Sequence, residues 1–247
     1  MDMIGKQSSH TNQRIVRIPL RVAGETKESL KILEGNLTVP ASNDAKGIVI
    51  FVHGAGSSLQ SQRNQYVAEM LNKDGLATLL VDLLTKGEED TDDRAQKMEN
   101  KIPGLVLNKF NIDLLSSRLL GVTDWVLENK EFSNLTIGYF GASTGAAAAL
   151  KAEIERPKNV AAIVSRGGRP DLVTAETLSR VKTPTLFIVG GFDNRVIDFN
   201  NKAMRLLLNL QKKKIVVIPG ASHLFEEPGA LEEVARLASG WFRCFFR

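Results

Sequence analysis

The sequence is poor in the residues that bind metals and form disulfides. It has a single cysteine, Cys244, and three histidines among its 247 residues. One cysteine excludes an internal disulfide, and it fits a reducing compartment, so a cytoplasmic location is expected. The histidines, His10, His53 and His223, are few and far apart in the chain. This spacing argues against a zinc site, and no metal or other cofactor is expected.

Long apolar runs and a strong charge of one sign are also missing. No apolar run approaches the length that crosses a bilayer, and residues 1–13 are polar, without the apolar core of a signal peptide. The net charge is +4, and the basic residues are scattered. Neither a membrane nor a nucleic acid is therefore expected as a partner. The short run Lys212–Lys214 is interpreted as the solvated start of a strand.

What the sequence does contain is an alternation of short apolar runs with longer periodic segments. The runs are rich in β-branched residues and bounded by turn residues, which is typical of parallel strands buried on both faces. They occupy residues 48–52, 77–81, 135–140, 160–164, 185–189 and 215–218. Two earlier runs, 15–20 and 30–39, are expected to add an antiparallel edge pair. The pattern predicts an α/β fold with a mostly parallel central sheet of about eight strands and helices on both faces.

The domain organisation follows from the same pattern. Residues 1–13 are expected to form a flexible N-terminal tail, and residues 14–247 a single domain. One charged segment, 85–109, interrupts the alternation and contains Gly87, Pro103 and Gly104. A connection of this length in a compact domain is usually functional or disordered. It is interpreted either as a partial cap over the active site or as a solvated surface excursion.

A nucleophile motif follows one of the apolar runs. Gly141-Ala142-Ser143-Thr144-Gly145 matches Gly-x-Ser-x-Gly, and it precedes a segment of small residues typical of a helix packed under a strand. In this context the serine occupies a strained turn that exposes its hydroxyl. The flanking glycines are needed because side chains there would clash with neighbouring backbone. Ser143 is therefore predicted to be a catalytic nucleophile.

A serine hydroxyl needs a base, and the base needs an acid to orient it. His223 follows the last predicted strand, and Asp193 follows the strand before it. The resulting chain order of serine, aspartate and histidine is the one expected for this type of sheet. Asp198 is interpreted as a helix cap, and Glu226 and Glu227 follow the histidine too closely to orient it. Asp193 and His223 are thus the predicted acid and base.

The tetrahedral intermediate of acyl transfer needs two donors for its oxyanion. The amide of Thr144, directly after the nucleophile, is the first prediction. The second is the amide of Ala55 in the turn after the first parallel strand, with Gly56 as the alternative. The same turn is not a nucleotide-binding loop, because a third glycine and a following Lys-Ser or Lys-Thr pair are missing.

Several polar residues follow strand ends and are candidate substrate contacts. Arg166 and Arg169 flank Gly167-Gly168 at a carboxyl strand end, where ligands of open parallel sheets bind. Arg63 and Asn64, which follow the turn that contains Ala55 and Gly56, are weaker candidates. An arginine here either holds a substrate carboxylate or phosphate, or ties loops together. Both interpretations are open from the sequence.

These motifs resemble those of a known group of enzymes. The stretches Val52–Ser57, Gly141–Ala149, Ser165–Asp171 and Pro219–Glu232 are similar to the dienelactone hydrolase-like branch of the α/β hydrolases, and the likeness covers residues 45–243. The resemblance implies the same fold and a hydrolytic activity. Dienelactone hydrolases proper use a cysteine nucleophile, whereas this position is Ser143, which argues against dienelactone as the substrate.

The expected function is hydrolysis of a small-molecule carboxylic ester, lactone or thioester through an acyl-serine intermediate. A peptidase or acyltransferase on the same triad is an alternative, because loops choose the leaving group and the acceptor. A non-catalytic binding protein with this fold is another. The oligomeric state, monomer or homodimer, stays open. The aromatic C-terminal segment 241–246 either packs on the sheet or forms part of a dimer contact.

Overall fold

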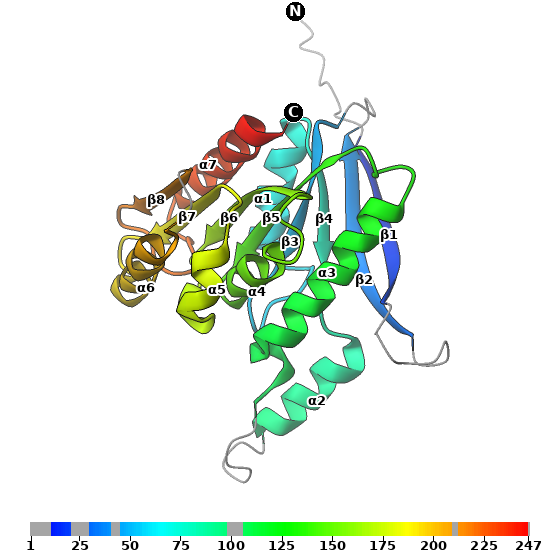
Figure 1. The fold of residues 1–247 in the computed structure, drawn as a ribbon, viewed down its shortest axis with the longest axis horizontal. Coiled ribbons are helices and arrows are strands. Elements are labelled where there is room, and N and C mark those ends of the chain that lie inside the picture. The colour runs from blue at the N-terminus through cyan, green and yellow to red at the C-terminus, as the bar shows by residue number, and fades with distance from the viewer. Residues whose placement is uncertain (1–10, 21–29, 41–44, 98–105, 209–211, 247) are drawn as a thin grey trace, which may run out of the picture.

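A computed structural model describes residues 11–20, 30–40, 45–97, 106–208 and 212–246. In these residues the chain forms an eight-stranded sheet with the order β1-β2-β4-β3-β5-β6-β7-β8 (Figure 1). The strands are β1 (Thr11–Leu20), β2 (Lys31–Pro40), β3 (Gly47–Val52), β4 (Ala77–Val81), β5 (Thr136–Ala142), β6 (Val160–Arg166), β7 (Thr185–Gly190) and β8 (Lys213–Ile218).

The strand directions confirm the predicted mostly parallel sheet. β1 pairs with β2, and β2 with β4, in antiparallel register, while all remaining neighbours are parallel. Each of the eight apolar runs became a strand. β1 begins at Thr11, so residues 11–13 belong to the sheet rather than to the expected tail. The rest of that tail lies outside the described residues.

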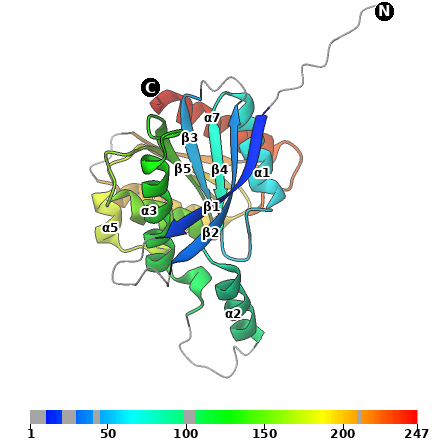
Figure 2. The ribbon, with the colours of Figure 1, turned by 90° about the vertical axis from the view of Figure 1, so that its right-hand side faces the viewer.

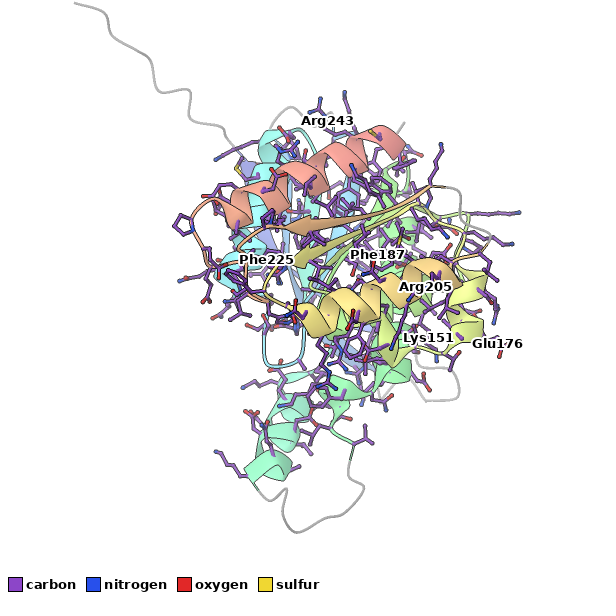
Figure 3. All side chains as sticks on the ribbon, turned by 90° about the vertical axis from the view of Figure 1, so that its left-hand side faces the viewer. Lys151, Glu176, Phe187, Arg205, Phe225 and Arg243 are labelled. Carbon is purple, nitrogen blue, oxygen red and sulfur yellow. The ribbon has the colours of Figure 1, made fainter. Side chains whose placement is uncertain are left out.

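Helices cover both faces of the sheet because its central strands are apolar on both sides. Every residue of β3, β4 and β7 is buried. Residues of two helices pack on one face, and residues of four helices on the other. Figures 2 and 3 show the two layers on either side of the strands. The first layer is α1 (Gln62–Lys73) and α7 (Ala230–Phe245), and the second is α3 (Ile112–Glu128), α4 (Thr144–Glu153), α5 (Ala175–Arg180) and α6 (Asn194–Leu206).

The C-terminal aromatic segment packs back onto the sheet. Phe242 is fully buried and Phe246 is 6% exposed. Their rings lie where Gly138 of β5 and Gly47 of β3 leave room, since a Cβ added at either glycine would come within 2.6 Å of a ring atom. The contact therefore supports the packing interpretation of this segment. Among the described residues, no helix combines the length and the apolar character needed to span a membrane.

Segment 85–109 contains a helix that sequence analysis did not anticipate. Helix α2 (Lys86–Lys97) projects from the body of the molecule, and the short 3-10 helix η3 (Asn108–Phe110) follows it (Figures 1 and 2). The carboxylate of Asp92 joins the two, because it accepts hydrogen bonds from the amides of Asn108 and Lys109 at 2.9 and 2.8 Å. Residues 98–105 lie outside the described part. A second 3-10 helix, η4 (Pro170–Leu172), follows β6.

The base of α2 is fixed to the core by one carboxylate. Glu88 accepts hydrogen bonds from the amide and the hydroxyl of Thr85, both at 2.9 Å, which closes the first turn of the helix. It also forms ion pairs with Arg118 of α3 and Lys31 of β2. Burial opposes the charge of Glu88, but these partners outweigh it and hold its pKa far below the usual range. The start of α2 is thus anchored by charge.

Candidate active site

Ser143 lies in a sharp turn between β5 and α4. Its backbone angles are φ 51° and ψ −118°, a conformation that side chains rarely adopt. The glycines on either side allow the turn to close. A Cβ on Gly145 would lie 2.2 Å from the carbonyl oxygen of Val52, and one on Gly141 would lie 2.5 Å from Cα of Ala146. The elbow therefore has the close packing that its sequence motif predicts.

Asp193 and His223 meet at the same edge of the sheet. Asp193 follows β7 at the N-cap position of α6 without a side-chain cap hydrogen bond, and His223 follows β8. Nδ1 of His223 lies 2.5 Å from Oδ2 of Asp193. A carboxylate at Nδ1 fixes the tautomer in which Nε2 is free to accept a proton. The histidine side chain is 40% exposed and the carboxylate 16%, so the acid is the more enclosed partner.

The loop after β6 lies against both the serine and the histidine. The amide of Ser143 donates to the carbonyl of Arg166 at 3.1 Å, and the amide of Arg169 donates to the carbonyl of Ser143 at 3.0 Å. Between them, a Cβ added at Gly167 would lie 3.3 Å from Cε1 of His223. One short loop thus contacts the backbone of the nucleophile and the ring of the base. The three predicted triad residues gather around it.

The two predicted oxyanion donors are neighbours in the structure. Thr144 is the first residue of α4, and Ala55 lies in the turn after β3. They are joined directly, because the amide of Ala55 donates to Oγ1 of Thr144 at 2.9 Å. Gly56, the alternative donor, has a φ of +78°, and a Cβ there would meet nothing within 4 Å. This arrangement places the Ala55 amide on the side of the nucleophile.

A second histidine–carboxylate pair, which sequence analysis did not identify, supports the turn after β3 that holds Ala55. Nδ1 of His53 lies 3.0 Å from the carbonyl oxygen of Gly54, and Nε2 lies 3.0 Å from Oδ1 of Asp82. The amide of Leu59 also donates to Asp82, at 2.6 Å. Burial opposes the charged imidazole, but the contacts with Asp82 and Gly54 prevail and raise the pKa of His53, with a smaller contribution from Glu89. His53 therefore fastens the turn to the end of β4.

This pair predicts a pH-dependent stability. Because the pKa of His53 is raised on folding, its contribution is complete below the unfolded value of 6.5 and is lost as pH rises through the folded value. We expect His53→Gln to unfold with about 1–3 kcal/mol less free energy near pH 6. The difference from wild type should shrink toward pH 9. Urea unfolding across this range measures it, and a difference that does not change with pH would contradict the assignment.

The three candidate arginines have different surroundings. Arg169 donates to both carboxylate oxygens of Asp171, each at 2.7 Å, and its guanidinium lies 5.1 Å from the ring centre of Phe199. Arg63 donates to Glu226 at 2.9 Å and lines the adjoining cavity. Arg169 is therefore held by Asp171 of its own loop and by Phe199 of α6, whereas Arg63 faces space that a ligand can enter.

Arg166 is a buried cation without a carboxylate partner among the described residues. It is 8% exposed, and its Nη2 donates only to the side-chain oxygen of Asn64, at 3.2 Å. Its Nε has no hydrogen-bond partner there. Burial, and next the neighbouring charge of Arg63, lower the pKa of Arg166 to about 10. The guanidinium carbon also lies 6.0 Å from the ring centre of Phe225, and Arg166 is not among the described residues that line the adjoining cavity.

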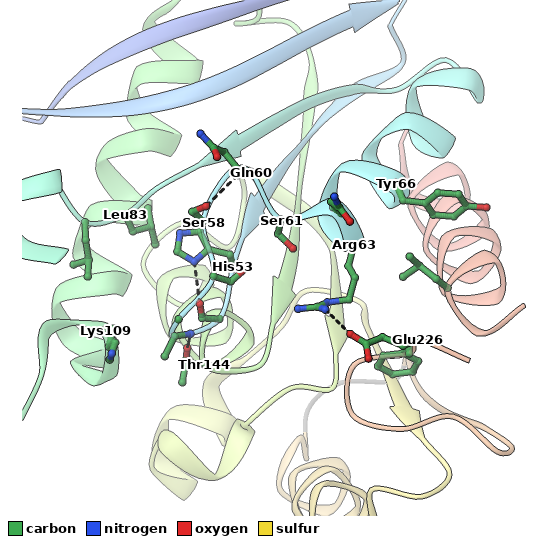
Figure 4. Close-up of a pocket in the computed structure, with 18 of the residues that line it drawn as sticks. His53, Ser58, Gln60, Ser61, Arg63, Tyr66, Leu83, Lys109, Thr144 and Glu226 are labelled. Carbon is green, nitrogen blue, oxygen red and sulfur yellow. Dashed lines mark hydrogen bonds and ion pairs between the residues drawn. The ribbon is translucent and has the colours of Figure 1, made fainter. Parts of the chain in front are cut away.

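A cavity of about 910 Å³ opens beside the elbow (Figure 4). Its walls come from the turn after β3, helix α2, the start of α4 and the loop that leads into α7. Ala55 and Thr144 are among the described residues that line it; Ser143, Asp193 and His223 are not. The cavity therefore adjoins the elbow at the two residues that were predicted to supply oxyanion donors. The contribution of α2 consists of Lys86, Glu89, Asp92 and Asp93.

Within the described ranges, no group of three or more histidine, cysteine, aspartate or glutamate side chains is arranged to hold a metal ion. The polar side chains that line the cavity include hydroxyls, carboxylates, lysines, Arg63 and His53.

Comparison with known proteins places this site in a family of hydrolases. The model of the dienelactone hydrolase family matches residues 33–245. A crystal structure of a dienelactone hydrolase from Anabaena variabilis is similar over 95% of this chain and 99% of that chain, with 49% identity and a TM-score of 0.82. Est1E from Butyrivibrio proteoclasticus shares the fold, with a TM-score of 0.69 over 92% of this chain and 97% of its own, at 16% identity.

Two curated relatives carry a different name. Proteins from two strains of Mycobacterium tuberculosis, named as phosphoribosyl transferases, are 50% identical over 208 residues. The match covers 84% of this chain but only 43% of those proteins. This chain therefore corresponds to less than half of each relative.

Proposed function

Because this chain belongs to the dienelactone hydrolase family, we propose that it is a serine hydrolase that cleaves a carboxylic ester, lactone or thioester through an acyl intermediate on Ser143. The observation that carries the proposal is the 2.5 Å contact between His223 and Asp193, at the sheet edge where Ser143 occupies its strained turn. An oriented base and a backbone-strained serine that lie against the same loop are the parts that acyl transfer requires.

The proposed reaction assigns one role to each residue. Nε2 of His223 takes the proton of the Ser143 hydroxyl as its oxygen attacks the carbonyl carbon, and Asp193 stabilises the imidazolium that forms. The leaving group departs with that proton. Water then repeats the sequence on the acyl-serine and releases the acid. The amides at the start of α4 face the developing negative charge, which the positive end of a helix stabilises.

The transferase name of the mycobacterial relatives does not guide this proposal. Those proteins are more than twice as long as the matched segment. The family model matches residues 33–245, and the elbow lies within that range. We therefore derive the activity from the site that this chain contains.

A substrate panel combined with active-site labelling tests the proposal. Wild-type protein should react with a fluorophosphonate probe, and peptide mass spectrometry should locate the adduct at Ser143. Aryl esters, lactones, thioesters and amides of matched acyl size then separate an esterase from a peptidase. Added alcohols and amines reveal acyl transfer. Folded protein that neither labels nor hydrolyses any of these would support a non-catalytic binding role and overturn the proposal.

We also propose that segment 85–109 forms a partial cap. Within its described part, α2 and Lys109 line the cavity, while Glu88 anchors the helix to α3 and β2. Helix α2 is anchored at its first turn and projects beyond it, so it can shape the entrance of the cavity. The cap would then help to choose which substrates reach the elbow.

Arginines near the elbow lead us to expect a preference for negatively charged substrates. We expect Arg63→Met and Arg166→Met each to slow hydrolysis of an acidic ester by about tenfold in kcat/KM, because a charge-assisted hydrogen bond to a carboxylate contributes about 1.5–3 kcal/mol. A neutral ester of equal size should change little. Arg169→Met is the matched control, since Asp171 already occupies that guanidinium. Equal losses on both esters would show that Arg63 and Arg166 only hold the loops.

A further inference from the structure

The amide of Ala55, the second expected oxyanion donor, already has a partner. Its hydrogen points to Oγ1 of Thr144, with 2.9 Å between nitrogen and oxygen. An amide carries one hydrogen, so it serves an oxyanion at full strength only by leaving this bond. Beside the Thr144 amide, the site therefore presents a hydroxyl where the second backbone amide was expected.

That hydroxyl has a proton to donate. A hydroxyl accepts through its lone pairs and donates through its single hydrogen, and Thr144 uses only the accepting side toward Ala55. Among the described residues, no acceptor for its hydrogen is found. Thr123 shows the usual behaviour of a helical threonine, since its hydroxyl donates to the carbonyl of Leu119 at 2.8 Å. Thr144 stands at the first position of α4, where the residue four places back belongs to strand β5.

The hydroxyl is also close to the nucleophile. The turn that holds Ala55 contacts Ser143, because a Cβ added at Gly54 would lie 2.8 Å from Cβ and 3.5 Å from Oγ of that serine. Thr144 follows the serine directly, is 3% exposed, and lines the cavity. Figure 4 shows its side chain on the cavity wall, with His53 above it on the turn after β3.

We infer that the hydroxyl of Thr144 is a donor of the oxyanion hole, acting beside the amide of the same residue and oriented by the amide of Ala55. This inference rests on the proposed function. An N–H that donates to a hydroxyl oxygen polarises its O–H bond and makes it a stronger donor. The hydroxyl turns toward the substrate by rotation alone, while Ala55 keeps its partner.

The proton of Thr144 stays on Thr144 throughout. As Oγ of Ser143 bonds to the carbonyl carbon, the π electrons move to the carbonyl oxygen, and the serine proton passes to His223. The oxyanion accepts a hydrogen bond from Thr144 until the carbonyl re-forms. The bond to the leaving group then breaks, and His223 returns the proton to that group.

Replacing Thr144 separates two opposite roles of the hydroxyl. In Thr144→Val the shape is kept and the hydroxyl is lost. If the hydroxyl donates, kcat should fall by about 10- to 100-fold at nearly unchanged KM, and fluorophosphonate labelling of Ser143 should slow in parallel. Thr144→Ser should restore most of both rates. If the hydroxyl only occupies the Ala55 amide, its removal frees that amide, and Thr144→Val should be as fast as wild type or faster.

The outcomes are distinguishable from failure of the proposed function. Wild type that is not labelled at Ser143 removes the proposed function and this inference with it. If the wild type is labelled and Thr144→Val is labelled equally fast, the proposed function stands and only the role of the hydroxyl is refuted. Thermal unfolding establishes that the variants are folded. If the valine variant does not fold, Thr144→Ala supplies the hydroxyl-free comparison, and rates equal to those of Thr144→Ser overturn the inference.

Discussion

Ser143→Ala is expected to reduce ester hydrolysis by roughly 10⁴- to 10⁶-fold, because no other group replaces the nucleophile and residual catalysis comes only from binding and the oxyanion donors. The protein should remain folded, since alanine keeps the Cβ that the strained turn already accommodates. Initial rates on a short-chain aryl ester measure the loss. Labelling by a fluorophosphonate should disappear in the same variant.

A matched control distinguishes loss of the nucleophile from disturbance of the elbow. Ser165 is fully buried in β6 on the neighbouring strand, and its hydroxyl has no partner among the described residues. We expect Ser165→Ala to keep wild-type turnover. Unchanged activity in Ser143→Ala would show that another residue performs the attack, and the proposed mechanism would be wrong.

The sheet could be predicted from the sequence because strands that are buried on both faces have a distinctive apolar pattern. Strands such as β3 and β7 are buried on both faces, so they appear as unbroken apolar runs between turn residues. Helix α2 carries no such pattern, because Asp92 is its only buried residue among those described. Its signal was local: Thr85 and Glu88 have the spacing of a capping box, and their side chains make that contact.

The gathering of Ser143, Asp193 and His223 at one edge of the sheet was predictable for a similar reason. The three residues follow the carboxyl ends of β5, β7 and β8, and parallel strands bring those ends to one edge. The contacts that hold the turn after β3 in place could not be predicted from the sequence. The pairing of His53 with Asp82 depends on β4 lying next to β3, and the bond from Ala55 to Thr144 joins residues 89 positions apart. Such contacts follow from register, which apolar runs do not specify.

The same limitation affected the arginines. Arg166 is the last residue of β6 and Arg169 lies three residues beyond it, as the predicted carboxyl strand end implies, but sequence position does not show which partners a guanidinium finds. Asp171, two residues along, occupies Arg169, while Arg166 turns inward to Asn64. Long side chains reach in several directions from one backbone position, so their roles depend on packing.

Asp193→Asn should give the second-largest loss, about 10³- to 10⁴-fold in kcat. The carboxylate lies 2.5 Å from Nδ1 of His223 and so keeps the hydrogen on that nitrogen. An asparagine amide in the same place can instead donate to Nδ1. The hydrogen of the neutral ring then moves to Nε2, which can no longer accept the proton of Ser143. Binding should suffer little, so KM is expected to stay close to the wild-type value.

The competing carboxylates provide the controls for this assignment. Asp198 is exposed on α6, Glu226 pairs with Arg63, and Glu227 accepts the amide of Ser222 at 3.0 Å. None of them has the contact with the histidine that Asp193 makes. Asp198→Asn should therefore retain wild-type kcat. A variant at Asp193 that stays within tenfold of wild type, beside a large loss at Asp198, would move the acid to α6 and require a different orientation of His223 in the working enzyme.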